Sequence, residues 1–78
     1  MVMMMEQKLE ALMHGFTTCL EDMVAEIEEV TGAEVIDNDY EYVIIAYEED
    51  GEDVQVQIHL GGTKRTIVVT GYEEVYRG

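Results

Sequence analysis

The sequence predicts an α+β fold in which one long N-terminal amphipathic helix packs on a three- to four-stranded antiparallel β-meander. Apolar residues recur at steps of three and four up to residue 31, and at steps of two in the later segments. The first period is that of a helix with one apolar face, and the second is that of half-buried strands. We expect residues 1–78 to form a single acidic α+β domain, since the length suits one domain.

The helix is predicted from Met4 to Thr31. Its apolar stripe is formed by residues at alternating steps of four and three, namely Leu9, Met13, Phe16, Leu20, Met23, Ile27 and Val30. Gly15, Thr17 and Thr18 are poor helix formers, so a soft or bent middle is expected. Gly32 ends the helix, because glycine adopts the left-handed conformation after a helix without strain. The stripe fits packing on a sheet, and it also fits a coiled-coil seam between two copies.

Several strands are predicted after the helix. The three main strands are marked by β-branched and aromatic residues or by alternation, and they span residues 40–48, 54–60 and 65–70. Two shorter segments, at 33–37 and 72–77, extend the sheet. Asp50-Gly51 and Gly61-Gly62 are predicted to form two-residue hairpin turns. Consecutive strands joined by such turns form an antiparallel meander.

These two turns also predict the register of the sheet. The first places Tyr47 opposite Val54, and the second places Val56 opposite Ile67. The apolar residues then share one face, which the helix stripe covers. The predicted core contains Phe16, Leu20, Met23, Val43, Ile45, Val56, Ile58 and Ile67.

Charge is the most unusual property of the chain. Eighteen acids against four bases give a net charge of −14, and no Lys or Arg lies between Leu9 and Thr63. We therefore expect no direct binding to nucleic acid or to anionic membranes, because both require basic residues. A basic protein is the favoured partner. A cytoplasmic location is expected, because no apolar run is long enough to span a membrane and the single Cys19 has no disulfide partner.

Motifs for chemistry are missing from the sequence. Residues 37–41 resemble the start of an EF-hand loop but lack its glycine at the sixth position. His14 and His59 have no second ligand at metal-binding spacing. No nucleophile–base arrangement or phosphate loop is found. We therefore expect no catalytic residue, no metal and no cofactor, and we expect that the protein is not an enzyme.

The acidic surface is the remaining candidate site. Asp22 and Glu26 form a like-charge pair one helical turn apart, and Glu48 faces Asp53 in the predicted hairpin. Such uncompensated conflicts tend to mark function, although solubility explains them as well. The predicted partner-binding residues are Glu10, Glu21, Asp22, Glu28, Glu29, Glu48, Glu49, Asp50, Glu52 and Asp53, with Tyr40 and Tyr42 as aromatic anchors.

In size, charge and compactness, the whole chain resembles small acidic phage-encoded inhibitors of the anti-CRISPR or DNA-mimic kind. The resemblance rests on no motif, and no family residue is transferred. It implies a protein that docks on a basic, nucleic-acid-binding effector and inhibits it. The alternative is a homodimeric structural or assembly module whose acidity serves only solubility, and an accessory subunit of an enzyme is a third interpretation.

Overall fold

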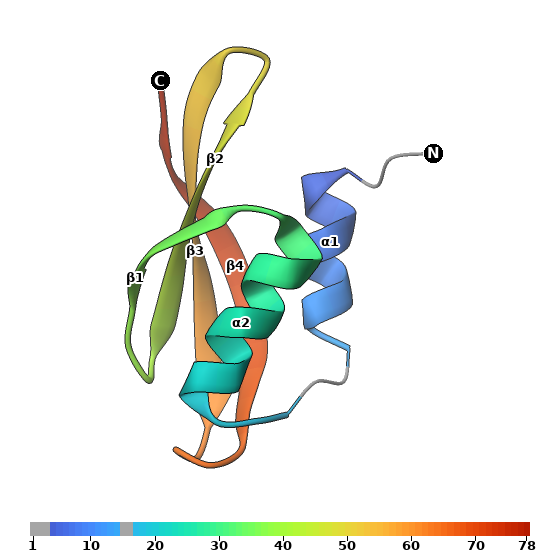
Figure 1. Cartoon of the computed structure of the whole chain (residues 1–78), viewed down its shortest axis with the longest axis vertical. Helices are drawn as coiled ribbons and strands as arrows, with labels where there is room; N and C mark the ends of the chain where they lie inside the picture. Colours follow the sequence, from blue (N-terminus) through green and yellow to red (C-terminus); the bar gives the residue numbers. More distant parts are fainter. Residues whose placement is uncertain (1–3, 15–16) are drawn as a thin grey trace.

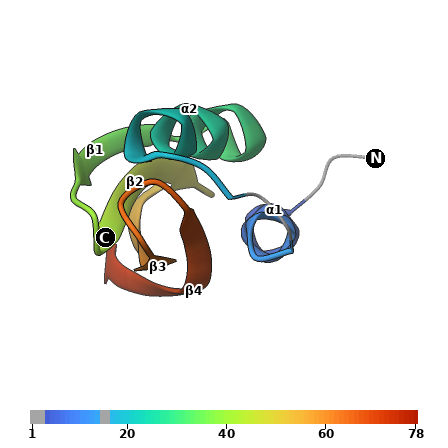
Figure 2. The ribbon, with the colours of Figure 1, turned by 90° about the horizontal axis from the view of Figure 1, so that it is seen from below.

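The computed structural model describes residues 4–14 and 17–78. Its elements are α1 (Met5–Leu12), α2 (Leu20–Thr31), β1 (Glu34–Asn38), β2 (Tyr42–Glu49), β3 (Glu52–Gly62) and β4 (Ile67–Arg77). The four strands form one antiparallel sheet in chain order (Figure 1). α2 lies across one face of this sheet, and α1 lies beside β4 (Figure 2). The predicted α+β class and the meander are confirmed.

The prediction of one long N-terminal helix is wrong, because the chain forms two short helices. α1 ends at Leu12 and α2 begins at Leu20. Between them, the backbone of Thr18 exchanges two hydrogen bonds with Ile67 at the start of β4, of 3.2 and 2.8 Å. Residues with low helix propensity thus pair with a strand instead of continuing the helix. The predicted core residue Phe16 lies outside the described residues.

The end of α2 agrees with the sequence. Gly32 has a φ of 70°, and its N–H donates to the Glu28 carbonyl at 2.8 Å. The buried Thr31 hydroxyl donates to the Ile27 carbonyl at 2.6 Å and accepts from the Ala33 N–H at 3.2 Å. These bonds satisfy buried polar groups where the chain turns from the helix toward β1.

The register between β2 and β3 is as predicted. Tyr47 lies opposite Val54, and Ile45 lies opposite Val56. The turn between the strands consists of Asp50 and Gly51, with φ values of 51° and 80°. Two successive positive φ angles match the twist of an antiparallel hairpin, which explains why this dipeptide predicts the register correctly.

The predicted turn at Gly61-Gly62 is wrong, because β3 continues to Gly62, which pairs with Ile67. The turn is formed instead by residues 63–66, where the Thr63 and Thr66 hydroxyls lie 2.6 Å apart. Gly62 has a φ of 91°, and a Cβ atom there would clash with the Thr66 carbonyl oxygen. Glycine is therefore needed for a close approach to the turn, and the predicted pairing of Val56 with Ile67 does not form.

Two bulges change the direction of side chains along β4. In the first bulge, Leu60 and His59 pair with Val69 and Gly71, so Thr70 is the extra residue. In the second, Val56 and Gln55 pair with Glu74 and Tyr76, so Val75 is the extra residue. Residues directly opposite each other share one face of a sheet. The first bulge therefore places Tyr72 and Glu74 on the core side of β4, opposite Ile58 and Val56. The second restores the original alternation, and Arg77 lies on the core side opposite Val54.

The core lies between α2, α1 and one face of the sheet. Its fully buried large side chains are Met23, Ile27, Ile45, Ile58, Ile67, Val43 and Val54. Of the other predicted core residues, Val56 is buried and Leu20 is only half-buried. α1 adds Leu9 and Leu12. No described helix covers the opposite face of the sheet, which we call the outer face (Figure 2).

Candidate acidic binding surfaces

The acids of α2 form the first candidate surface. Glu21 and Glu28 are seven residues apart on the helix, as are Asp22 and Glu29, so the four side chains lie on two adjacent stripes. All four are exposed, while Met23 and Ile27 on the other side of the helix are buried. We call Glu21, Asp22, Glu28 and Glu29 the α2 acidic ridge.

The predicted partner-binding set combines these acids with the hairpin acids, which lie on other parts of the molecule. The first turn of α2 and the turn between β2 and β3 lie toward opposite ends of the long axis (Figure 1). The hairpin acids are themselves divided between the two faces of the sheet. Glu48 and Asp53 lie opposite each other on the outer face, whereas Glu49 and Glu52 lie on the core side. Asp50 lies in the turn itself.

Arg77 holds the core-side acids of the hairpin. Its guanidinium lies 2.6 Å from Glu74 Oε1, 3.3 Å from Glu49 Oε1 and 3.5 Å from Glu52 Oε2. These hydrogen bonds, chiefly that to Glu74, raise the pKa of Arg77 above its ordinary value. Two of the predicted partner-binding acids, Glu49 and Glu52, are thus engaged within the chain.

A cleft of about 270 Å³ lies beside this cluster, between α1 and the sheet. Its lining combines apolar side chains of α1 with tyrosines and the charged cluster, namely Met4, Met5, Glu6, Leu9, Tyr47, Glu49, Val56, Tyr72, Glu74 and Arg77. The charged residues of this lining are three acids and one base, and Arg77 already pairs with Glu49 and Glu74 within the chain.

Glu10 has a role within the fold. The Tyr72 hydroxyl donates a hydrogen bond of 3.0 Å to Glu10 Oε1, which ties α1 to β4. Burial and this hydrogen bond raise the pKa of Tyr72. The carboxylate of Glu10 is therefore engaged in the contact between α1 and the sheet.

The two predicted anchor tyrosines lie away from the hairpin acids. Tyr40 is exposed in the connection between β1 and β2, and Lys64 Nζ lies 5.1 Å from the centroid of its ring. Tyr42 lies on the outer face opposite His59, and its hydroxyl donates to Asp37 Oδ2 at 3.0 Å. That hydrogen bond raises the pKa of Tyr42.

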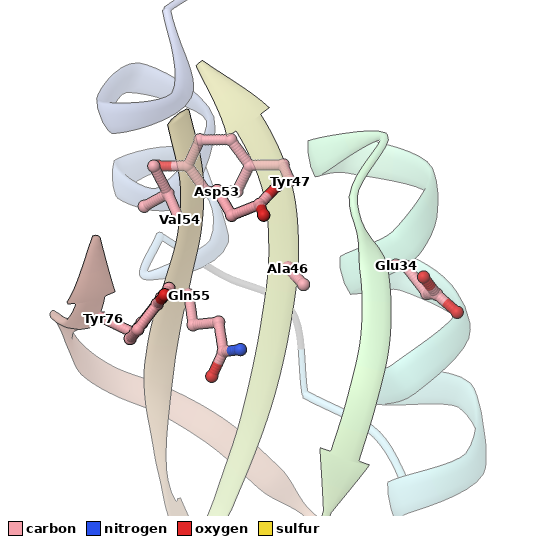
Figure 3. Close-up of a pocket in the computed structure, with 7 residues that line it drawn as sticks. All are labelled: Glu34, Ala46, Tyr47, Asp53, Val54, Gln55 and Tyr76. Carbon is pink, nitrogen blue, oxygen red and sulfur yellow. The ribbon is translucent and has the colours of Figure 1, made fainter. Parts of the chain in front are cut away.

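The outer face has a groove that the sequence does not predict. We call it the outer groove; it has a volume of about 400 Å³ and is lined by Glu34, Ala46, Tyr47, Asp53, Val54, Gln55 and Tyr76. Ala46 and Gln55 lie side by side on β2 and β3, with Glu34 on one side and Tyr76 on the other (Figure 3). Tyr76 is 52% exposed. Asp53 is the one lining residue that belongs to the predicted partner-binding set.

Most of the acids are uncompensated. Within residues 4–14 and 17–78, ion pairs shorter than 4.0 Å are made by Arg77 and by His59, whose Nε2 lies 3.3 Å from Glu73 Oε1. The α2 acidic ridge takes part in none of them. In the same part of the chain, no group of three His, Cys, Asp or Glu residues is arranged to hold a metal ion. Neither described helix has the length and apolar character to span a bilayer.

Comparison with protein-family models, with curated proteins and with solved structures finds no match to the chain.

Proposed function

We propose that this protein is a non-enzymatic acidic binding protein that docks on a basic, nucleic-acid-binding protein and inhibits it, in the manner of anti-CRISPR proteins or DNA mimics. The proposed location is the cytoplasm, where both partners would meet. In this proposal the α2 acidic ridge is the primary contact, because its carboxylates are exposed on a regular helix and make no ion pair with the described residues.

The last turn of α2 is the observation that supports this proposal most directly. Glu28 and Glu29 lie near the negative end of the helix dipole, where no basic residue is found. Each carboxylate there destabilises the helix by about 0.3–1 kcal/mol, whereas a basic residue would stabilise it. A local cost without compensation inside the chain is expected where a residue serves an intermolecular contact.

The test is a competition between this protein and DNA. Purified basic DNA-binding proteins from the source organism are incubated with duplex DNA, with and without the acidic protein, over a range of salt concentrations. We expect the acidic protein to displace DNA from its target, with an effect that weakens steeply as salt rises. The triple variant Glu21→Lys, Glu28→Lys, Glu29→Lys should lose this effect while remaining folded.

A second triple variant provides the matched control. Glu6→Lys, Glu41→Lys and Glu73→Lys produce the same change in net charge at exposed sites outside the α2 acidic ridge. We expect this control to retain most of the inhibition. Equal inhibition by the parent and the ridge variant would refute the proposal, because the acids of α2 would then serve only solvation.

One observation favours the alternative of a homodimeric structural or assembly module. The outer face includes Ile44, Ala46 and Val68, which are only partly buried and lie on the side of the sheet that no described helix covers. Apolar association is strengthened by excluded salts such as sulfate, whereas docking driven by charge is weakened by salt. Sedimentation equilibrium at low and high salt therefore separates the two functions.

A further inference from the structure

The centre of the outer face differs in charge from the rest of this acidic molecule. Three facing pairs of β2 and β3 contribute no acid to it: Tyr42 with His59, Ile44 with Gln57, and Ala46 with Gln55. On the neighbouring strands, Asp37 accepts the hydrogen bond of Tyr42 and Glu73 pairs with His59. Glu34 and Asp53, which line the outer groove, have no ion pair within the described residues. The carboxylates of this face that have no partner in the described residues therefore lie toward the outer groove, which suits a partner that brings a cation to that end.

The hairpin itself shows what kind of cation fits. On the core side, the facing glutamates Glu49 and Glu52 are bridged by the guanidinium of Arg77. On the outer face, the next facing pair is Glu48 and Asp53, and the ion pairs of the described residues do not include either of them. Facing like charges destabilise a sheet. An arginine from outside would relieve this repulsion as Arg77 does one position further along.

The other lining residues of the outer groove favour arginine over lysine. Tyr76 is 52% exposed, and a planar guanidinium stacks on an exposed aromatic ring better than a hydrated ammonium does. The Gln55 amide oxygen and the Asp53 carboxylate are acceptors for the N–H donors of a guanidinium. The small Ala46 leaves room for the aliphatic stem.

From these contacts we propose that the outer groove receives an arginine side chain from the surface of a basic protein partner. This inference rests on the proposed function and adds to it a second contact, on the face of the sheet opposite α2. The partner then meets the molecule through one arginine in a defined groove, in addition to the general attraction of the charges.

The experiment uses nuclear magnetic resonance of the full ¹⁵N-labelled chain, titrated with N-acetyl-arginine amide, with the lysine analogue and with the glutamine analogue. We expect saturable shifts of the backbone amides of Ala46, Gln55 and Tyr76 with the arginine compound, and weaker shifts with lysine. Tyr76→Ala should weaken arginine binding about two- to fivefold, whereas Tyr76→Phe should retain it. Asp53→Asn should weaken it, and Glu41→Gln, with the same change in charge outside the groove, should not.

Three results would overturn the inference. One is equal binding of arginine and lysine, and another is a set of shifts spread over all acidic segments, since both indicate general charge attraction. The third is a set of shifts at Ala46, Gln55 and Tyr76 that depends on protein concentration without any added compound, since a second copy then occupies the groove. None of these results decides the DNA competition test with the α2 variants, so failure here is distinguishable from failure of the proposed function.

Discussion

Three of the four basic side chains show how different the surroundings of a base are in this molecule. Arg77 contacts three glutamates, and Lys64 lies over the ring of Tyr40. Arg65 is exposed, and the described ion pairs do not include it. Single exposed ion pairs contribute little to stability, but a base that separates several acids also removes their mutual repulsion. The contribution of each base to stability therefore depends on which acids surround it.

Replacing Arg77 by alanine is expected to lower the melting temperature, because Glu49 and Glu52 would then face each other without a bridge. The decrease should shrink at high salt, which screens the repulsion. Arg65→Ala is the matched control, because it removes the same charge from an exposed site. Thermal unfolding followed by circular dichroism measures both, and equal decreases would show that the cluster has no special role.

Alkaline pH should destabilise the fold through its tyrosines. The hydrogen bond to Asp37 raises the pKa of folded Tyr42 above the ordinary value of 10.0, and burial raises the pKa values of Tyr47 and Tyr72. Because the neutral form is favoured in the folded state, this stabilisation is complete below about pH 10 and is lost as pH rises through the folded pKa values. Tyr42→Phe should make the alkaline loss of stability shallower in urea unfolding at several pH values. Tyr76→Phe is the control, and identical pH profiles of the two variants would contradict the prediction.

At the scale of elements, short-range turn chemistry determines how much of the fold can be predicted. Asp50-Gly51 is predictive because both residues adopt positive φ within the turn. Gly61-Gly62 misleads, because Gly62 is required for its close approach to Thr66 and not for a turn of its own. The apolar stripe continues through the break near Thr18, because α1 and α2 pack on one core, so periodicity cannot reveal the break.

The candidate sites are less predictable than the core, and the reason is the sheet register. The acids of α2 follow from helical spacing alone. The Arg77 cluster and the outer groove depend on bulges opposite Val56 and Leu60, which have no reliable sequence signal. Together the bulges shift the pairing by two residues, so that Tyr76 and Arg77 lie opposite Gln55 and Val54. The groove also requires the start of β1 and the end of β4 to lie on either side of the hairpin strands, a feature of the whole sheet.

The packing of α2 is tested by Ile27→Ala, which removes a fully buried side chain between α2 and the sheet. We expect a loss of about 2–5 kcal/mol in the free energy of unfolding, measured by urea denaturation. Ile36→Ala makes the same chemical change at a residue that is 46% exposed, and it should cost less than about 0.5 kcal/mol. Similar losses at both sites would mean that α2 is not the main cover of the core.

Replacing an acid by a base should have opposite effects on the free energy of unfolding at the two ends of α2. Glu28→Lys places a base in the last turn and should stabilise the protein by about 0.3–1 kcal/mol, while Glu21→Lys, in the first turn, should destabilise the helix by a similar amount. Both variants change the net charge equally, so the difference between their unfolding free energies isolates the dipole. Equal free energies of unfolding for the two variants would contradict a helix with these ends.

The whole molecule measures 37 × 26 × 17 Å and has a net charge of −14. Its acids are found on α2, on both faces of the hairpin and near the turns, so no single surface holds them all. The repulsion among them acts over distances comparable with the Debye length of about 10 Å at moderate salt. Such a field attracts basic proteins from several directions, which leaves geometry to select the bound orientation.

Added sodium chloride is expected to raise the melting temperature, because it screens repulsion throughout the folded chain and the described residues contain few ion pairs to lose. Circular dichroism melts over increasing salt measure the effect. The triple variant Glu21→Lys, Glu28→Lys, Glu29→Lys carries less net negative charge, so its melting temperature should rise less with salt than that of the parent. A melting temperature that falls steadily with salt would mean that local attraction between charges outweighs their repulsion.

The hydrogen-bonded bridge between Thr18 and Ile67 has a consequence for the order of folding. The meander joins neighbouring strands through short turns, so its pairings close small loops and form rapidly. The bridge joins two distant parts of the chain and cannot close until β4 is in place. We therefore expect α1 to dock late, after the rate-limiting barrier. Substitutions that strengthen its contacts should then slow unfolding and leave the rate of folding almost unchanged.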